Sequence, residues 1–220
     1  MAFNRFTSTV LSFILIACLT TVTSGQRAKQ STDNRKARAS ENKEQRAKAL
    51  QKIAKRLGIG TGDTIADIGA GRGQDSWVFA RIVGPSGKVL AEEIETEKTK
   101  QLQEAAKERG LSQVKVILGE TADPLLPAES VNMAYMNRVY HHFSQPRQLR
   151  QELWRALKPG GYLVIVDQRL GTLTDWVPLE ERAKKHHWTA ETTVVREARE
   201  QGFRYVESAE QYWEAKDQFV

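Results

Sequence analysis

The stretch TIADIGAGRG at residues 64–73 decides the fold of this chain. It combines a short apolar strand, an acid near the end of that strand at Asp67, and a loop with glycine at every second position. An apolar segment at helical spacing, residues 77–83, follows. Glycine lets a backbone turn sharply and approach a ligand closely, and the first turn of a helix has unpaired N–H groups. The stretch therefore predicts a strand, a nucleotide-binding loop and a helix.

The details of this loop indicate which nucleotide it binds. A dinucleotide-binding loop reads G-x-G-x-x-G, but here Gly69, Gly71 and Gly73 are followed by Gln74, where the third glycine of that pattern should fall. The motif resembles the first motif of the class I S-adenosylmethionine-dependent methyltransferases, here of an exported bacterial type. The ammonium group of that cofactor would be attracted by a carboxylate such as Asp67, whereas a diphosphate would be repelled.

The resemblance continues through three further segments and covers roughly residues 45–208. These are an apolar strand that ends in acids (88–94), a strand with its following loop (114–127), and a helix that leads through Lys-Pro-Gly-Gly (158–161) into another strand. In the resembled family the cofactor contacts the glycine loop and the strand ends. The resemblance thus assigns cofactor binding to Asp67, Gly69, Ala70, Gly71, Gly73, Glu93, Ile94, Thr121, Ala122, Asp123 and Asn137.

Two of these assignments have an alternative. The resemblance implies that Glu93 accepts hydrogen bonds from the ribose hydroxyls, but the neighbouring acid Glu92 leaves the register open by one residue, and alternation along a strand points only one of the pair to the site. It also implies that Asp123 accepts the adenine amine. Because Asp123 precedes Pro124, it could equally be a simple turn acid.

The order of apolar segments predicts an α/β fold, in which a Rossmann-like, doubly wound and mostly parallel sheet has helices on both faces. The last antiparallel strand of the family is expected to be short or missing, because only residues 217–220 remain for it. The expected strands are 64–68, 88–94, 114–120, 131–137, 162–167 and 202–208, and the expected helices are 41–57, 75–83, 96–109, 146–157 and 189–201.

Two histidine pairs provide candidates for acid–base chemistry on a methyl acceptor. In doubly wound sheets the ligand lies beyond the carboxyl ends of the strands, and Tyr140 and His141 follow the fourth strand there. His187, beside His186, precedes the last expected helix. We predict His141, Tyr140 and His187 as catalytic residues and residues 168–185 as the acceptor lid. Four histidines without an H-x-x-x-H spacing or a cysteine partner predict no metal site.

The N-terminus predicts export. Residues 1–25 contain a thirteen-residue apolar run typical of a bacterial signal peptide, with cleavage near Ser24 or, as a lipoprotein signal, at Cys18. A basic flexible linker (26–40) and the methyltransferase domain (41–220) are expected to follow. Residues 27–57 carry eleven basic and three acidic residues, which favours peripheral or lipid-anchored membrane contact. They contain no aromatic side chain for base stacking, so no specific nucleic-acid partner is expected.

Together these observations predict an enzyme of the periplasm or cell envelope that transfers a methyl group from S-adenosylmethionine to a small-molecule or lipid-like acceptor. A non-catalytic S-adenosylmethionine-binding protein is the alternative. An NAD(P)-dependent oxidoreductase is a weaker one, because Gln74 and Asp67 both disfavour a dinucleotide. The sequence predicts no particular oligomeric state.

Overall fold

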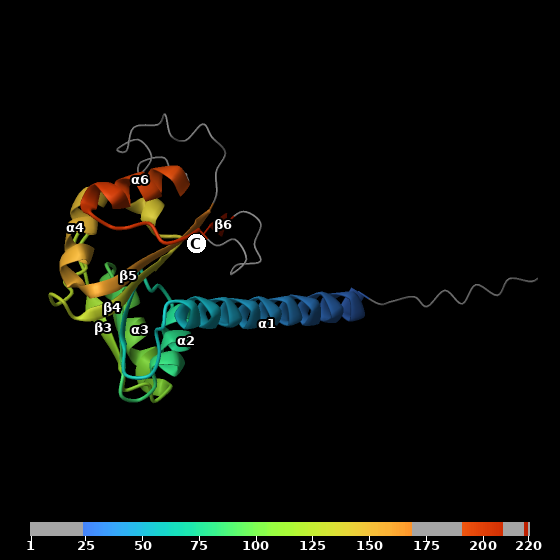
Figure 1. The fold of residues 1–220 in the computed structure, drawn as a ribbon. Coiled ribbons are helices and arrows are strands. Elements are labelled where there is room, and N and C mark those ends of the chain that lie inside the picture. The colour runs from blue at the N-terminus through green and yellow to red at the C-terminus, as the bar shows by residue number, and fades with distance from the viewer. Residues whose placement is uncertain (1–23, 169–190, 209–217, 220) are drawn as a thin grey trace, which may run out of the picture. The chain divides into compact units, whose positions relative to one another are not determined.

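The computed structural model describes residues 24–168, 191–208 and 218–219. The chain divides into two units, Met1–Glu41 and Asn42–Val220. Within the first unit the described residues are helical from Ser24 onward. The second unit is an α/β domain built around a single sheet (Figure 1). The expected signal peptide, with Cys18, lies outside the described residues.

The sheet confirms the predicted Rossmann-like class. Its strand order is β3-β2-β1-β4-β5-β6, and every pair from β3 to β5 is parallel. Among the described residues, strand β6 is antiparallel to β5 and pairs through Asp167–Phe219 and Gln168–Gln218. The last antiparallel strand is therefore present and short. The strands are β1 (Thr64–Ile68), β2 (Lys88–Glu93), β3 (Val114–Leu118), β4 (Val131–Asn137), β5 (Leu157–Gln168) and β6 (Gln218–Phe219).

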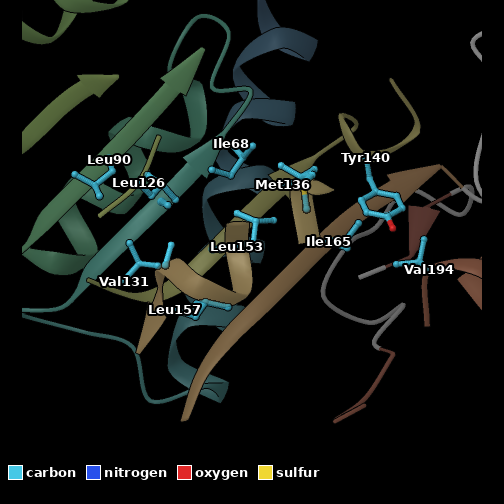
Figure 2. Close-up of a cluster of buried hydrophobic side chains, with 14 residues drawn as sticks. Ile68, Leu90, Leu126, Val131, Met136, Tyr140, Leu153, Leu157, Ile165 and Val194 are labelled. Carbon is cyan, nitrogen blue, oxygen red and sulfur yellow. The ribbon is translucent and has the colours of Figure 1, made fainter. Parts of the chain in front are cut away.

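Helices cover both faces of the sheet. Successive side chains of a strand point to opposite faces, and the central strands β1 and β4 have buried apolar residues on both. On one face, Ile65, Met133 and Val164 pack with residues of α1 and α2. On the other face, Ala66 and Met136 pack with residues of α4 and α6, in the cluster of Figure 2. Helix α3 packs on β2 beside α2. The helices are α1 (Ser24–Arg56), α2 (Gln74–Val83), α3 (Thr96–Glu108), the 3-10 turn η1 (Tyr140–His142), α4 (Pro146–Ala156) and α6 (Glu191–Gln201).

Helix α1 begins earlier than predicted. A flexible linker was expected at residues 26–40, and the structure has helix there, continuous with the expected helix from residue 41. The segment is rich in alanine, arginine, lysine and glutamine, all of which favour helix, and it contains neither proline nor glycine. Its low hydrophobicity therefore does not prevent helix formation.

The prediction of a sixth strand at residues 202–208 was wrong. Residues 203–208 have no strand pairing, and the chain instead anchors Phe203 against Trp154, with ring centroids 4.9 Å apart. A strand requires a neighbouring strand for its backbone hydrogen bonds. Among the described residues, the neighbours of β5 are β4 on one side and β6 on the other, so residues 202–208 do not pair with it. An apolar–polar alternation alone could not reveal this.

Strand β5 also starts five residues before the predicted position. The pairing shifts from Val131–Leu157 to Met133–Tyr162, so the Lys-Pro-Gly-Gly segment forms an irregularity within the strand instead of a separate turn. A Cβ on Gly161 would lie 2.9 Å from the carbonyl oxygen of Lys158 and 3.1 Å from that of Asn132. Glycine is therefore required for the two backbones to approach here.

None of the helices that the structure describes is long and apolar enough to cross a membrane.

Candidate active site

The glycine loop connects β1 to α2 and is shaped by backbone geometry. Gly69, Gly71 and Gly73 all have positive φ angles, of 67°, 55° and 74°. A Cβ on Gly69 would lie 2.7 Å from a methyl group of Val139, and one on Gly73 would lie 2.3 Å from the Trp77 ring. Both glycines thus permit close packing. Gly71 differs, because the nearest protein atom to its Cβ position is 4.0 Å away, so the space above it is open to a ligand.

The two acids at the end of β2 each hold one part of this loop. The N–H of Gly69 donates to Glu92 Oε2 at 3.0 Å, and the N–H of Gly71 donates to Glu93 Oε2 at 3.1 Å. Glu92 is directed against Gly119, where a Cβ would lie 2.0 Å from its Oε1. Burial raises the pKa of Glu92 to about 7.

Glu93 also fixes the start of α3. Its Oε1 accepts the N–H groups of Ile94 at 3.0 Å and Glu95 at 3.3 Å. Its carboxylate therefore lies at the junction of the open glycine Gly71 and the β2–α3 turn. This is the position expected of the acid that contacts the ribose. The oxygens of Glu92 lie against Gly69 and Gly119, and the choice between the two acids as the ribose partner stays a prediction.

Asp67 lies on the other side of the loop and is almost completely buried, with 3% exposure. Ser76 Oγ donates to its Oδ2 at 2.5 Å. Burial, followed by the negative charge of Asp75, raises the pKa of Asp67, and the hydrogen bond from Ser76 and the charge of Arg46 act in the opposite direction. A buried carboxylate of this kind gains from a cation placed beside it. The environment of Asp67 is therefore suited to its predicted role as the partner of the cofactor's ammonium group.

Asp75, in the first turn of α2, is the centre of a second polar group that includes Asn137. Arg46 of α1 forms a two-point ion pair with it. Tyr135 Oη donates to Asp75 Oδ2 at 3.1 Å, and Asn137 Nδ2 donates to the same atom at 3.0 Å. Asn137 Oδ1 is buried and has no hydrogen-bond partner among the described residues. An acceptor in this state is suited to a ligand that carries N–H donors.

The loop after β3 contains the three residues expected at the adenine. Asp123 Oδ1 accepts the N–H of Leu125 at 2.8 Å, a contact typical of a turn acid, and the contact of Asp123 with the adenine stays a prediction. Thr121 is exposed and Ala122 is buried. Ile94, at 48% exposure, offers an apolar surface at the end of β2.

His141 forms a buried pair with Asp167 at the carboxyl ends of β4 and β5. Its Nδ1 lies 2.8 Å from Asp167 Oδ1 and 3.0 Å from Oδ2, and its backbone N–H donates to Asp167 Oδ2 at 3.3 Å. Asp167 is fully buried and His141 is 6% exposed. Sequence reasoning missed Asp167. The signal was available, since this acid ends a predicted strand at the edge where the ligand lies.

Tyr140 is placed differently from the prediction. Its hydroxyl donates to Glu197 Oε2 of α6 at 2.5 Å and accepts a hydrogen bond from Arg150 Nη1 of α4 at 2.6 Å. Arg150 also donates to Glu197 at 3.0 Å. All three side chains are buried, and burial raises the pKa of Tyr140 far above its ordinary value. Tyr140 therefore belongs to a buried network that holds η1 against α4 and α6, and its predicted catalytic role has no support in these contacts.

The other predicted catalytic residue, His187, and its neighbour His186 lie outside the described residues. Residues 169–185 of the expected acceptor lid lie outside them as well. His142 is exposed, and its ring centroid lies 4.0 Å from that of His141. Within the described ranges, no group of three or more histidine, cysteine or acidic side chains could hold a metal ion.

The chain matches known methyltransferases. A family model described as "Methyltransferase domain" matches residues 59–217. The structure of a SAM-dependent methyltransferase from Aquifex aeolicus is similar with a TM-score of 0.65 and 28% identity, over 77% of this chain and 86% of that one. The chain therefore belongs to the S-adenosylmethionine-dependent methyltransferase family, and its cofactor is S-adenosylmethionine.

Two curated relatives extend the comparison. An arsenite methyltransferase of Halobacterium salinarum is 30% identical over 48% of this chain and 27% of its own length. A nocamycin O-methyltransferase of Saccharothrix syringae is 33% identical over 46% of this chain and 36% of its own length. The chain thus matches about a third or less of the length of these relatives.

The residues present fit this cofactor. The space above Gly71 is open, and Asn137 Oδ1 is buried without a hydrogen-bond partner among the described residues. Burial raises the pKa of Asp67, so a cation beside this carboxyl group would stabilise its charged form. An amino acid tail with an ammonium group meets the last two requirements at once.

Proposed function

We propose that this protein transfers the methyl group of S-adenosylmethionine to a small-molecule or lipid-like acceptor. The observation that carries the proposal is the junction between the glycine loop and the His141 segment. Val139 packs directly on Gly69, and His141 follows two residues later, paired with Asp167. A cofactor-binding loop and a buried histidine–aspartate pair are thereby held at the same edge of the sheet.

The cofactor would be held by residues at the ends of β1, β2 and β4. Asp67 and Asn137 Oδ1 would bind the ammonium group, and Gly69, Ala70, Gly71 and Gly73 would line the tail and ribose. Glu93 would accept the ribose hydroxyls. Ile94, Thr121, Ala122 and Asp123 would surround the adenine. When bound, the cofactor supplies an electrophilic methyl group.

His141 would act as the general base on the acceptor. Because Asp167 accepts only, its contact with Nδ1 favours the tautomer that carries its proton on Nδ1. Nε2 is then the basic nitrogen that takes the proton as the acceptor becomes nucleophilic. Asp167 orients the ring and stabilises its protonated form. Burial of both groups excludes water from the pair.

The proposal of a small acceptor is supported by the names of relatives. They include methyltransferases of arsenite and nocamycin and a demethylmenaquinone methyltransferase of Listeria welshimeri that is 25% identical over 56% of this chain. These acceptors share small size and differ in chemistry, so they support a class and no single compound.

The test is an untargeted transfer assay. The purified protein is incubated with methyl-labelled S-adenosylmethionine and with cell-envelope or cytosolic extract, and the fraction that gains label is identified. His141→Ala serves as the control and should lose the label while it still binds cofactor. Cofactor binding with no transfer to either extract would instead support a non-catalytic S-adenosylmethionine-binding protein. Binding of NAD(P) in place of S-adenosylmethionine would overturn both.

We further propose that the protein is exported to the periplasm or cell envelope, with residues 1–25 as signal, 26–40 as a basic linker segment and 41–220 as the enzymatic domain. The apolar run ahead of a basic stretch supports this order. Fractionation of cells that express the full chain and Cys18→Ala tests it. Full-chain protein found only in the cytosol would contradict export, and membrane attachment lost on Cys18→Ala would indicate lipidation.

A further inference from the structure

We propose that Arg46 and Asp75 are positioning residues for the cofactor's amino acid tail. They hold the side-chain amide of Asn137 in the orientation that directs its acceptor oxygen, Oδ1, toward the bound cofactor. The proposal rests on the proposed function for the location of the tail. It adds a role in the cofactor site for helix α1, which the sequence predicts only as a helix over residues 41–57.

The geometry centres on Asp75. Its carboxylate receives the Arg46 guanidinium through Nε and, at 2.7 Å, through Nη2. The same carboxylate accepts hydrogen bonds from Tyr135 Oη at 3.1 Å and Asn137 Nδ2 at 3.0 Å. Asp75 is 4% exposed and Arg46 is 32% exposed. Residues of α1, α2 and β4 therefore meet in one hydrogen-bonded group.

This group determines which way the Asn137 amide faces. An amide side chain has one acceptor atom and one donor group, and an ionised carboxylate can only accept. Asn137 must therefore direct Nδ2 to Asp75, which leaves Oδ1 on the opposite side. Oδ1 is buried without a partner among the described residues, a state that costs free energy until a donor arrives. The ammonium group of the cofactor is such a donor.

Arg46 maintains the charge balance that this arrangement needs. Asp67 and Asp75 are both buried, their charged forms repel each other, and the charge of Arg46 favours the charged form of both. Removal of Arg46 would leave the Asp75 carboxylate buried without its cation, which is strongly unfavourable. The hydrogen bonds to Tyr135 and Asn137 would then rearrange, and Oδ1 would lose its fixed direction.

The test uses two ligands that differ only in the tail region. S-adenosylhomocysteine carries the amino acid tail, and 5′-methylthioadenosine ends at the sulfur with a methyl group. Calorimetry is performed on the full chain with Arg46→Met, which keeps an unbranched apolar stem and removes the charged guanidinium. We expect the affinity for S-adenosylhomocysteine to fall about tenfold or more and that for 5′-methylthioadenosine to stay within about twofold.

Two further variants sharpen the result. Asn137→Leu should show the same ligand-selective loss, and combining it with Arg46→Met should add little, because the two changes act on one group. Arg46→Lys, which retains the charge, should restore part of the lost affinity. Arg56→Met is the matched control on the same helix, since Arg56 pairs with Glu207 at a more exposed position, and it should change neither affinity.

An equal loss for both ligands would overturn the proposal, because it would indicate a general disturbance of the fold. Unchanged S-adenosylhomocysteine binding in Arg46→Met or Asn137→Leu would also overturn it, as would a wild-type protein that binds both ligands equally. These outcomes are separable from failure of the proposed function, which is judged by methyl transfer in the wild-type protein.

Discussion

The two halves of the carboxyl edge of the sheet use carboxylates in different ways. On the cofactor half, Glu92 and Glu93 accept hydrogen bonds from backbone N–H groups of the glycine loop. On the acceptor half, Asp167 and Glu197 pair with side chains, His141 and Tyr140. Every residue except proline offers a backbone N–H, so these contacts of Glu92 and Glu93 depend on backbone shape, and their sequence signature is glycine. The acceptor half depends on particular side chains brought together by the fold.

The largest effect is expected from breaking the cofactor half. Asp67→Ala removes the partner of the ammonium group, and Gly71→Val fills the open space above the loop and strains a positive φ. Each should weaken S-adenosylhomocysteine binding about 100-fold or more, equivalent to about 3 kcal/mol, as measured by calorimetry.

Gly110→Val is the matched control for the loop variant. Gly110 has a similar positive φ of 64° and open space around its Cβ position, but it lies between α3 and β3 at the opposite edge of the sheet. It should cost stability and leave the affinity unchanged. Micromolar binding retained by either loop variant would refute the loop assignment.

Breaking the acceptor half should separate transfer from binding. His141→Ala removes the proposed base and should lower kcat about 100-fold or more, and Asp167→Asn should lower it about tenfold or more by disturbing the ring tautomer. Both should keep cofactor affinity within about threefold. The measurement combines methyl transfer to the labelled extract fraction with calorimetry. If both variants lost cofactor affinity together with methyl transfer, the cofactor half and the acceptor half would not act independently.

The buried network next to His141 should contribute to stability. Glu197→Gln leaves the Arg150 guanidinium buried without its anion, and we expect a loss of about 3–5 kcal/mol in the free energy of unfolding, measured with urea. The control is Glu152→Gln, whose partner Arg155 is 44% exposed, with an expected loss of about 1 kcal/mol or less. Equal losses in the two variants would contradict a buried role for Glu197.

The smallest effect concerns pH and Glu92. The folded-state pKa of Glu92, about 7, lies above its ordinary value of 4.5, so the folded protein binds this proton more tightly than the unfolded chain. The resulting stability is fully present below pH 4.5 and is lost as the pH rises through 7. Glu92→Gln keeps an acceptor for Gly69 and carries no charge to desolvate.

Glu92→Gln should therefore raise Tm by about 2–8 °C at pH 8, where the charged form costs up to about 3 kcal/mol. At pH 5 its Tm should lie within about 2 °C of the wild type. Thermal melts at both pH values decide the matter, and a shift that is the same at pH 5 and pH 8 would contradict a raised pKa for Glu92.

The same contrast explains what the sequence could predict. The glycine loop, the acids at the end of β2 and five of the strands follow from local patterns, and the structure reproduces them with shifts of up to five residues at the strand ends. Asp167 was within reach, because it ends a predicted strand at the ligand edge. The groups around Asp75 and Arg150 were not, because Arg46 is 29 residues from Asp75 and Glu197 is 47 residues from Arg150, and no local pattern marks such pairs. The wrong strand at residues 202–208 has the same cause, since pairing depends on a neighbour that alternation does not reveal.

The most direct measurement of the central claim is a crystal structure of the protein with S-adenosylhomocysteine. We predict that the cofactor's amino nitrogen lies within hydrogen-bond distance of both the Asp67 carboxylate and Asn137 Oδ1, with the ribose hydroxyls on Glu93. A complex in which the amino acid tail lies away from Asp67, or in which Glu93 does not contact the ribose, would contradict this account of the site.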